Sequence, residues 1–289
     1  LLTNATGRHR DESLVAGLTG TVLDEMIVGT SNNSAAETLA GGGGEDQFFG
    51  DGGNDTFIGN GNDTVNYTTL TSFDAACGGL TMSGPLTSAG NGTAILFDGT
   101  NSWTQTYLGI NEIIGTRGDD VLYGAAIANG GGHSTLHGGR GDDQLHDGGT
   151  FTTVADYSDF NTYVSISMTW DDGAGEYRGV VSGGGDTDTT HDILSFVGSA
   201  WSDTFNGSGG DETFVGGAGT DTFSAGGGFD TIAYWDAMHG VHVDLSSNKT
   251  WDDGFGGEDT LFDVEQVFGS KYGDTIIGGD GNDMLSGQA

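Results

Sequence analysis

A single large apolar residue recurs at intervals of nine along much of the chain, each time between two smaller or polar neighbours. Four successive apolar residues keep this interval between residues 198 and 233, namely Phe205, Phe214, Phe223 and Ile232. One apolar residue flanked by two outward-facing positions is typical of a short strand with one side chain in the core. We therefore expect short strands separated by tight turns.

Longer segments connect the runs of short strands, and they follow a different pattern. Apolar and polar residues alternate in segments such as 163–168 and 241–245, as they do in half-buried strands. No sustained helical period appears anywhere. The hydrophobic pattern thus predicts an all-β chain with longer β connecting stretches.

The nine-residue units share the motif G-G-x-G-x-D-x-U-x, in which U is the large apolar residue. Copies stand at 41–49, 50–58, 59–66 (one residue short), 138–146, 207–215, 216–224, 225–233, 269–277 and 278–286. A longer period is superimposed, because units that open with Gly and then Ser or Thr begin at residues 20, 115, 198 and 269. We expect one continuous solenoid made of a polar segment 1–13 and four repeat units, 14–67, 68–157, 158–234 and 235–289.

Two nine-residue units make one coil, so turns 18 residues apart stack on the same edge, about 4.8 Å from each other. Asp203 then lies above Asp221, and Glu212 above Asp230. Stacked carboxylates repel each other unless a cation is shared between them. The glycines permit positive φ and let carbonyl oxygens converge, and an all-oxygen shell of carboxylates and carbonyls favours Ca²⁺.

These arguments give a set of candidate calcium ligands and no candidate catalytic residue. The side-chain ligands are Asp46, Asp55, Asp63, Asp120, Asp143, Asp203, Asp221, Asp230, Asp274 and Asp283, with Glu25, Glu37 and Glu212 as weaker ones. The backbone carbonyl ligands are those of Gly42, Gly44, Gly53, Gly61, Gly118, Gly139, Gly141, Gly217, Gly219, Gly226, Gly228, Gly279 and Gly281. In the unit at 129–137, Ser134 stands where an Asp is expected.

Composition and charge narrow the functional classes. The 289 residues include 57 Gly, one Pro, and 42 Asp and Glu against 7 Lys and Arg, for a net charge of −35. That charge repels nucleic acid and anionic lipid, and no apolar run approaches the length of a membrane span, so we expect neither partner. The lone Cys77 cannot form an internal disulfide. Since the charge opposes compaction without cations, metal binding and folding should be coupled.

The motif resembles the RTX (repeats-in-toxin) calcium-binding β-roll of secreted bacterial proteins, the hemolysin-type calcium-binding repeat family. The resemblance covers most of residues 14–287. It implies a right-handed parallel β-roll or β-helix solenoid with several structural Ca²⁺ ions, secretion (usually by a type I exporter) and folding triggered by extracellular calcium.

We expect a non-enzymatic, calcium-binding structural region of a secreted or cell-surface protein, such as an adhesin, surface-layer or filament component. Copies of itself, other cell-surface proteins and glycans are its candidate partners. One alternative is a C-terminal export and folding module of a larger RTX toxin or secreted hydrolase, since the chain resembles a fragment. A weaker alternative is a polysaccharide-binding or polysaccharide-modifying β-helix.

Paired acids occur twice in the tetrapeptide WDDG, at 170–173 and 251–254. They could act as glycosidase carboxylates, but their repetition favours turns, or additional cation sites.

Overall fold

The computed structural model describes residues 8–10, 18–28, 36–50, 52–68, 78–87, 89–125, 133–149 and 153–287. Cys77 and most of the polar segment 1–13 lie outside these residues. The chain divides into two compact units, Leu1–Thr153 and Val154–Ala289. The finer division into four repeat units stays a prediction.

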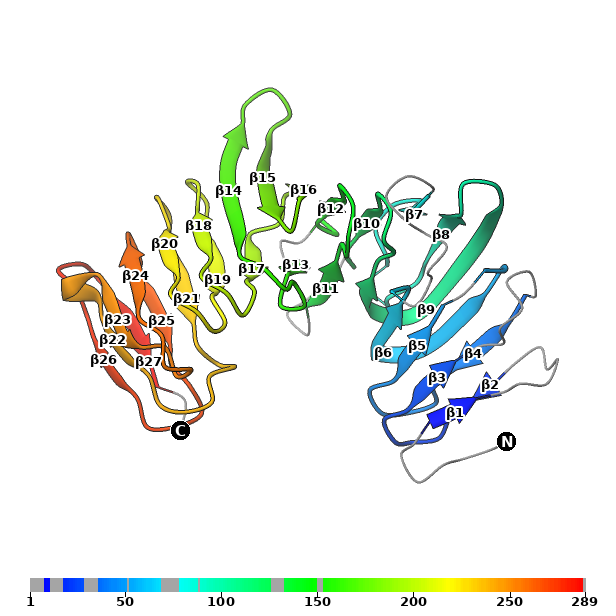
Figure 1. Ribbon diagram of the computed structural model, residues 1–289, viewed down its shortest axis with the longest axis horizontal. Helices are drawn as coiled ribbons and strands as arrows, with labels where there is room; N and C mark the ends of the chain where they lie inside the picture. The colour runs from blue at the N-terminus through cyan, green and yellow to red at the C-terminus, as the bar shows by residue number, and fades with distance from the viewer. Residues whose placement is uncertain are drawn as a thin grey trace. The chain divides into compact units, whose positions relative to one another are not determined.

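In the first unit the short strands stack into two ladders, which the long strands β6 and β9 join by running through both (Figure 1). One ladder has the order β2 (Leu18–Thr19), β4 (Thr38–Ala40), β6 (Thr56–Asn66), β9 (Ser102–Ile114), β8 (Gly92–Phe97), β7 (Leu80–Met82), β10 (Val121–Tyr123) and β12 (Gln144–His146). The other has β1 (Arg8–Arg10), β3 (Met26–Val28), β5 (Gln47–Phe49), β6, β9 and β11 (Ser134–His137).

The second unit repeats this arrangement with two separate ladders. The first has the order β16 (Asp186–His191), β15 (Glu176–Gly183), β14 (Val164–Asp171), β18 (Thr204–Asn206), β20 (Thr222–Ser224), β24 (Asp259–Phe262), β23 (Lys249–Asp252), β22 (His242–Asp244) and β26 (Thr275–Ile277). The second has β13 (Thr153–Asp156), β17 (Ser195–Val197), β19 (Thr213–Val215), β21 (Thr231–Ala233), β25 (Gln266–Phe268) and β27 (Met284–Ser286).

The long connecting segments form three-stranded antiparallel meanders inserted into these ladders. They are β7–β8–β9, β14–β15–β16 and β22–β23–β24. Outer strands of the meanders pair in parallel with the short strands beside them, as β24 does with β20, β22 with β26 and β14 with β18. The β14–β15 hairpin extends beyond the short strands of its unit (Figure 1). The alternating pattern predicted strands here, but not that the middle strand runs opposite to the rest.

The core lies between the two ladders and takes the central side chain of most short strands. Phe205 stacks on Phe223 of the next coil with ring centroids 4.7 Å apart, and it meets Phe214 of the opposite ladder at 5.2 Å. All three rings are fully buried. The nine-residue spacing therefore builds two interlocking columns of apolar side chains.

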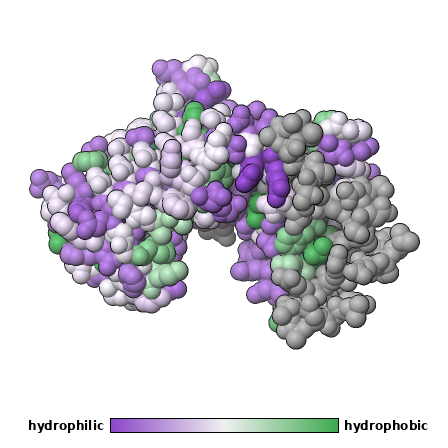
Figure 2. Space-filling model, viewed as in Figure 1, coloured by the Kyte–Doolittle hydropathy of each residue, from purple (hydrophilic) through white to green (hydrophobic). Residues whose placement is uncertain are grey.

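The structure confirms an all-β roll of stacked parallel short strands. The described residues contain no α-helix, and their one helical segment is the 3₁₀ turn η1 (Leu245–Ser247). None of their helices has the length and hydrophobicity needed to cross a membrane. Figure 2 shows hydrophilic residues over much of the visible described surface, with hydrophobic ones in smaller patches.

Replacement of Phe223 should destabilise the calcium-loaded roll strongly. Phe223→Ala removes a buried ring that is stacked on Phe205, and we expect a loss of about 3–5 kcal/mol in the free energy of unfolding. Phe229→Ala is the matched control, because Phe229 is 39% exposed. Denaturant unfolding in excess calcium gives the free energy of unfolding of both variants. Equal losses in the two variants would contradict the placement of Phe223 in the core.

Candidate metal centre

Each nine-residue unit forms a tight turn followed by a short strand, and glycine is needed at particular points of the turn. In the unit at 216–224, Gly217 has φ +83° and Gly219 has φ +144°, a region that side chains with a Cβ rarely adopt. The same holds for the candidate backbone ligands Gly42, Gly44, Gly53, Gly139, Gly141, Gly226 and Gly228, whereas Gly118, Gly279 and Gly281 lie outside this region. Gly61 lies inside strand β6, in the unit that is one residue short.

The first glycine of a unit lies directly against the carboxylate of the same unit. A Cβ on Gly216 would come within 3.0 Å of the Asp221 Oδ2, and one on Gly138 would meet the Asp143 Oδ2 in the same way. At Gly198 the Cβ would meet both the Asp203 Oδ2 and the carbonyl oxygen of Gly216 in the next coil. Carboxylate and carbonyl oxygens therefore converge in a space that only glycine leaves open.

The carboxylates of successive coils form ladders through one of their two oxygens. The backbone N–H of Asp203 donates to the Asp221 Oδ1 at 2.8 Å, and the N–H of Glu212 donates to the Asp230 Oδ1 at the same distance. The 18-residue spacing predicts this stacking. Equivalent bonds of 2.7–3.1 Å join Glu25 to Asp46, Glu37 to Asp55, Asp46 to Asp63 and Asp120 to Asp143.

The second carboxylate oxygen is left buried without a hydrogen-bond partner in five of the candidate ligands. These atoms are the Oδ2 of Asp46, Asp221, Asp230 and Asp274 and the Oε2 of Glu212. A buried anionic oxygen without a donor is costly, and a hard cation that prefers oxygen ligands compensates it. The residues present therefore fit Ca²⁺, held by these carboxylates and neighbouring carbonyls.

Carboxylates converge in pairs along the ladders rather than in larger groups. Within the described ranges, no three His, Cys, Asp or Glu side chains gather as a metal-binding group. Backbone carbonyls must therefore supply much of any coordination shell, which is consistent with the glycine requirement of the turns.

Burial raises the pKa of several ladder carboxyls. Loss of solvation is the main cause, and it raises the pKa of Asp46 to about 6, of Asp230 to about 7 and of Asp221 to about 9. Neighbouring carboxylates raise these values further, while backbone N–H bonds lower them. In the metal-free roll Asp230 and Asp221 thus hold their negative charge poorly at neutral pH.

Three of the units that open with Gly and then Ser or Thr bond both oxygens of their carboxylate within the protein, whereas the units of Glu212 and Asp274 open in the same way and leave one oxygen without a partner. The N–H of Ser199 donates to the Asp203 Oδ2 at 2.6 Å, and its hydroxyl donates to the Oδ1 at 2.9 Å. Thr116 makes the same pair of bonds to Asp120, and Thr21 makes an equivalent pair to Glu25. At these three positions the protein's own donors reach both oxygens, so their role as calcium ligands stays a prediction.

The outermost coil holds the last two candidates. Val241 N–H donates to the Asp274 Oδ1 at 3.0 Å, and Gly279 N–H donates to the Asp283 Oδ2 at 2.6 Å. Both side chains are half-buried, because they lie in the final coil of the described chain.

Two ladder positions were missed from the sequence. Asp259 accepts from the Asp221 N–H at 3.0 Å, and Glu265 accepts from the Asp230 N–H at 3.0 Å. Asp259 belongs to the segment GFGGEDTLF at 254–262, which keeps the motif apart from its second glycine, so its spacing could have identified it. Glu265 follows a connecting segment and carries no comparable signal.

Uncharged residues occupy other positions of the ladder. Gln105 is fully buried and its Nε2 donates to the Gly53 carbonyl at 2.7 Å. Ser134 is buried, with its Oγ accepting from the Ala125 N–H at 3.0 Å. At both positions a neutral side chain replaces the carboxylate, so no cation is required there.

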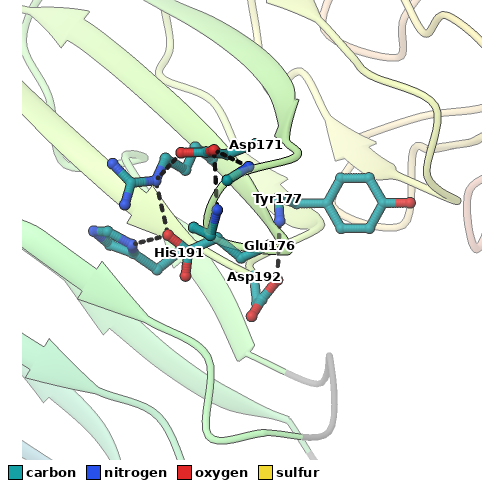
Figure 3. A network of polar contacts seen from close by, with 8 residues as sticks. Asp171, Glu176, Tyr177, His191 and Asp192 are labelled. Carbon is teal, nitrogen blue, oxygen red and sulfur yellow. Dashed lines mark hydrogen bonds and ion pairs between the residues drawn. The ribbon is translucent and has the colours of Figure 1, made fainter.

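Asp171 and Asp172 of the first WDDG segment lie at the tip of the β14–β15 hairpin and take no part in the carboxylate ladders. Figure 3 shows Asp171 in this position. Asp171 accepts from the N–H groups of Gly173 and Ala174, and its Oδ2 lies 3.2 Å from the Arg178 Nε. Glu176 pairs with Arg178 at 2.7 Å and with His191 at 3.1 Å. The acids of this segment thus form a turn beside the Arg178 guanidinium, as the turn interpretation of the motif predicts.

A methyl group at the first glycine should weaken calcium binding. Gly216→Ala places a Cβ against the Asp221 Oδ2, and we expect it to cost about 1–3 kcal/mol of calcium-induced stability. Gly227→Ala is the control, because nothing lies within 4 Å of its Cβ position. Calcium titrations followed by circular dichroism compare the two, and equal midpoints would contradict the proposed geometry.

Low pH should stabilise the metal-free roll and so replace part of the stabilisation that calcium provides. The folded pKa values of Asp46, Asp230 and Asp221 lie above the ordinary 3.8, so the metal-free fold binds more protons than the unfolded chain does. Its stability is therefore greatest below about pH 4 and is lost as pH rises through 6 to 9. In chelator, circular dichroism should show β-structure at pH 4 and lose it by pH 8; the opposite trend would contradict the raised pKa values.

Comparisons with known proteins agree with this geometry. A search of curated proteins finds no significant match. The family model for the RTX calcium-binding nonapeptide repeat (4 copies) matches residues 31–65, 106–126, 129–149, 197–232 and 253–289, about half of the chain. The match includes the turns and carboxylate ladders of both units, and the chain therefore belongs to the RTX calcium-binding nonapeptide repeat family.

Proposed function

We propose that this chain is a calcium-dependent structural region of a secreted or cell-surface bacterial protein, and that it folds when it meets extracellular calcium. The buried second oxygens of the ladder carboxylates carry this proposal, because the roll cannot hide them at neutral pH without a cation. The ions are then part of the fold rather than an addition to it.

The charge of the chain supports an extracellular site of folding. A net charge of −35 opposes compaction wherever calcium is scarce, and extracellular modules bind calcium at about 10⁻⁴–10⁻³ M. The chain would then stay extended inside the cell, in a form that suits export through a type I system, and would become compact outside.

We assign the role to structure rather than catalysis because the ladder carboxylates are directed into the turns and fixed there by backbone N–H groups. An adhesin, surface-layer or filament component fits this role, with copies of the chain, other surface proteins or glycans as partners. Service as the export and folding module of a larger toxin or hydrolase would use the same calcium chemistry.

Sedimentation velocity across a calcium titration tests the proposal, with magnesium as the control. We expect an expanded monomer to become compact at millimolar calcium, and not at equal magnesium, because the site requires flexible all-oxygen coordination. Growth into large species that a chelator reverses would favour a self-assembling surface protein, and a compact monomer would favour the module. A chain that is equally compact in chelator would contradict calcium-dependent folding.

A further inference from the structure

The loop that follows β23 holds a fully buried acid, Asp253, which belongs to the second WDDG segment. Its Oδ1 accepts from the N–H groups of Phe255 and Gly257, both at 2.8 Å. Its own N–H donates to the Gly257 carbonyl at 3.1 Å. These three bonds fix the direction of the carboxylate, which differs in this respect from the exposed Asp172 of the first WDDG segment.

The other oxygen of Asp253 faces a carbonyl group rather than a donor. The Asp253 Oδ2 is buried and has no hydrogen-bond partner. A Cβ on Gly257 would lie within 3.0 Å of both this atom and the Gly219 carbonyl oxygen. Two oxygens that carry negative charge therefore point at the same space, which glycine leaves open.

Gly219 belongs to the turn that carries Asp221, whose Oδ2 also lacks a partner. Asp259 does not donate to the Asp221 Oδ2, because both of its own oxygens accept hydrogen bonds. Its Oδ1 accepts from the Asp221 N–H, and its Oδ2 accepts from the Tyr234 hydroxyl at 3.1 Å. None of the ion pairs found among the described residues includes Asp221 or Asp253. The Asp253 Oδ2 and the Gly219 carbonyl oxygen thus face the same space without a positive charge between them.

We propose that the Asp253 Oδ2, the Gly219 carbonyl and the carboxylate of Asp221 bind a Ca²⁺ ion, so that a connecting segment supplies a calcium ligand outside the nine-residue motif. The inference rests on the calcium binding proposed above for the ladder. The ion joins the loop 253–257 to the coil of Asp221, beside the unit at 254–262 in which Phe255 replaces the second glycine of the motif.

A proton on Asp253 is the competing explanation, because a neutral carboxyl could donate to the Gly219 carbonyl. The variant Asp253→Asn distinguishes a bound calcium ion from a bound proton. The amide keeps the Oδ1 acceptor and offers an N–H to Gly219, so it imitates the protonated acid but is a poor calcium ligand.

Native mass spectrometry of the full chain at saturating calcium counts the ions. We expect Asp253→Asn to bind one calcium ion fewer than the wild type, and to melt at a lower temperature than the wild type in saturating calcium. Asp172→Asn is the matched control: its carboxylate is exposed and bonds to the Trp170 indole at 2.9 Å, so the count should not change.

An unchanged ion count in folded Asp253→Asn would overturn this site while leaving the ladder proposal intact; a wild type that binds no calcium would overturn both. If the variant does not fold, crystals of the wild type grown with calcium decide. An ion about 2.3–2.6 Å from the Asp253 Oδ2 and the Gly219 oxygen supports the site, and their direct hydrogen bond overturns it.

Discussion

The buried carboxylate is the constraint on which the rest of this structure depends. One of its oxygens accepts a backbone N–H from the neighbouring coil, and in several coils the other oxygen has no donor at all. The glycines follow from this, because a Cβ at the first position of the turn would occupy the space in front of that oxygen. The strands are short for the same reason, since each must return the chain to the next turn.

The core alone is thin, and this makes the turns more important for stability. Most short strands contribute one large inward side chain, as those of Phe205, Phe214 and Phe223 do. A core of this kind buries little apolar surface per residue, so the ladder carboxylates and their cations share the task of holding the coils together. Three units that open with Gly and then Ser or Thr are the exception, because both oxygens of their carboxylates accept from donors within the protein, as those of Asp203 do from Ser199.

The repeated parts of the fold could be predicted from the sequence, and the irregular parts could not. The spacing of nine identified the strands, the inward residues and the stacking of Asp203 over Asp221, since each depends on local geometry that repeats. Asp259 was accessible to the same reasoning but was missed because Phe255 interrupts the motif. Asp253 and Glu265 enter the ladder regions from connecting segments, and long-range packing alone brings them there. The two WDDG segments show the limit of prediction from local sequence, because identical residues form an exposed hairpin tip in one place and a buried loop in the other.

The meanders impose a parity rule on any change in length. The meanders β7–β8–β9 and β22–β23–β24 each replace a single strand of their ladder by three, so their outer strands keep the direction of the coils on both sides. An insertion that added one strand or three would leave an outer strand reversed, and the turns beyond it would fall on the wrong edge. Residues can nevertheless be added at a hairpin tip such as 171–176 without disturbing the pairing. Repeat units of unequal length can therefore occupy one regular lattice of turns, provided that strands are gained or lost in pairs.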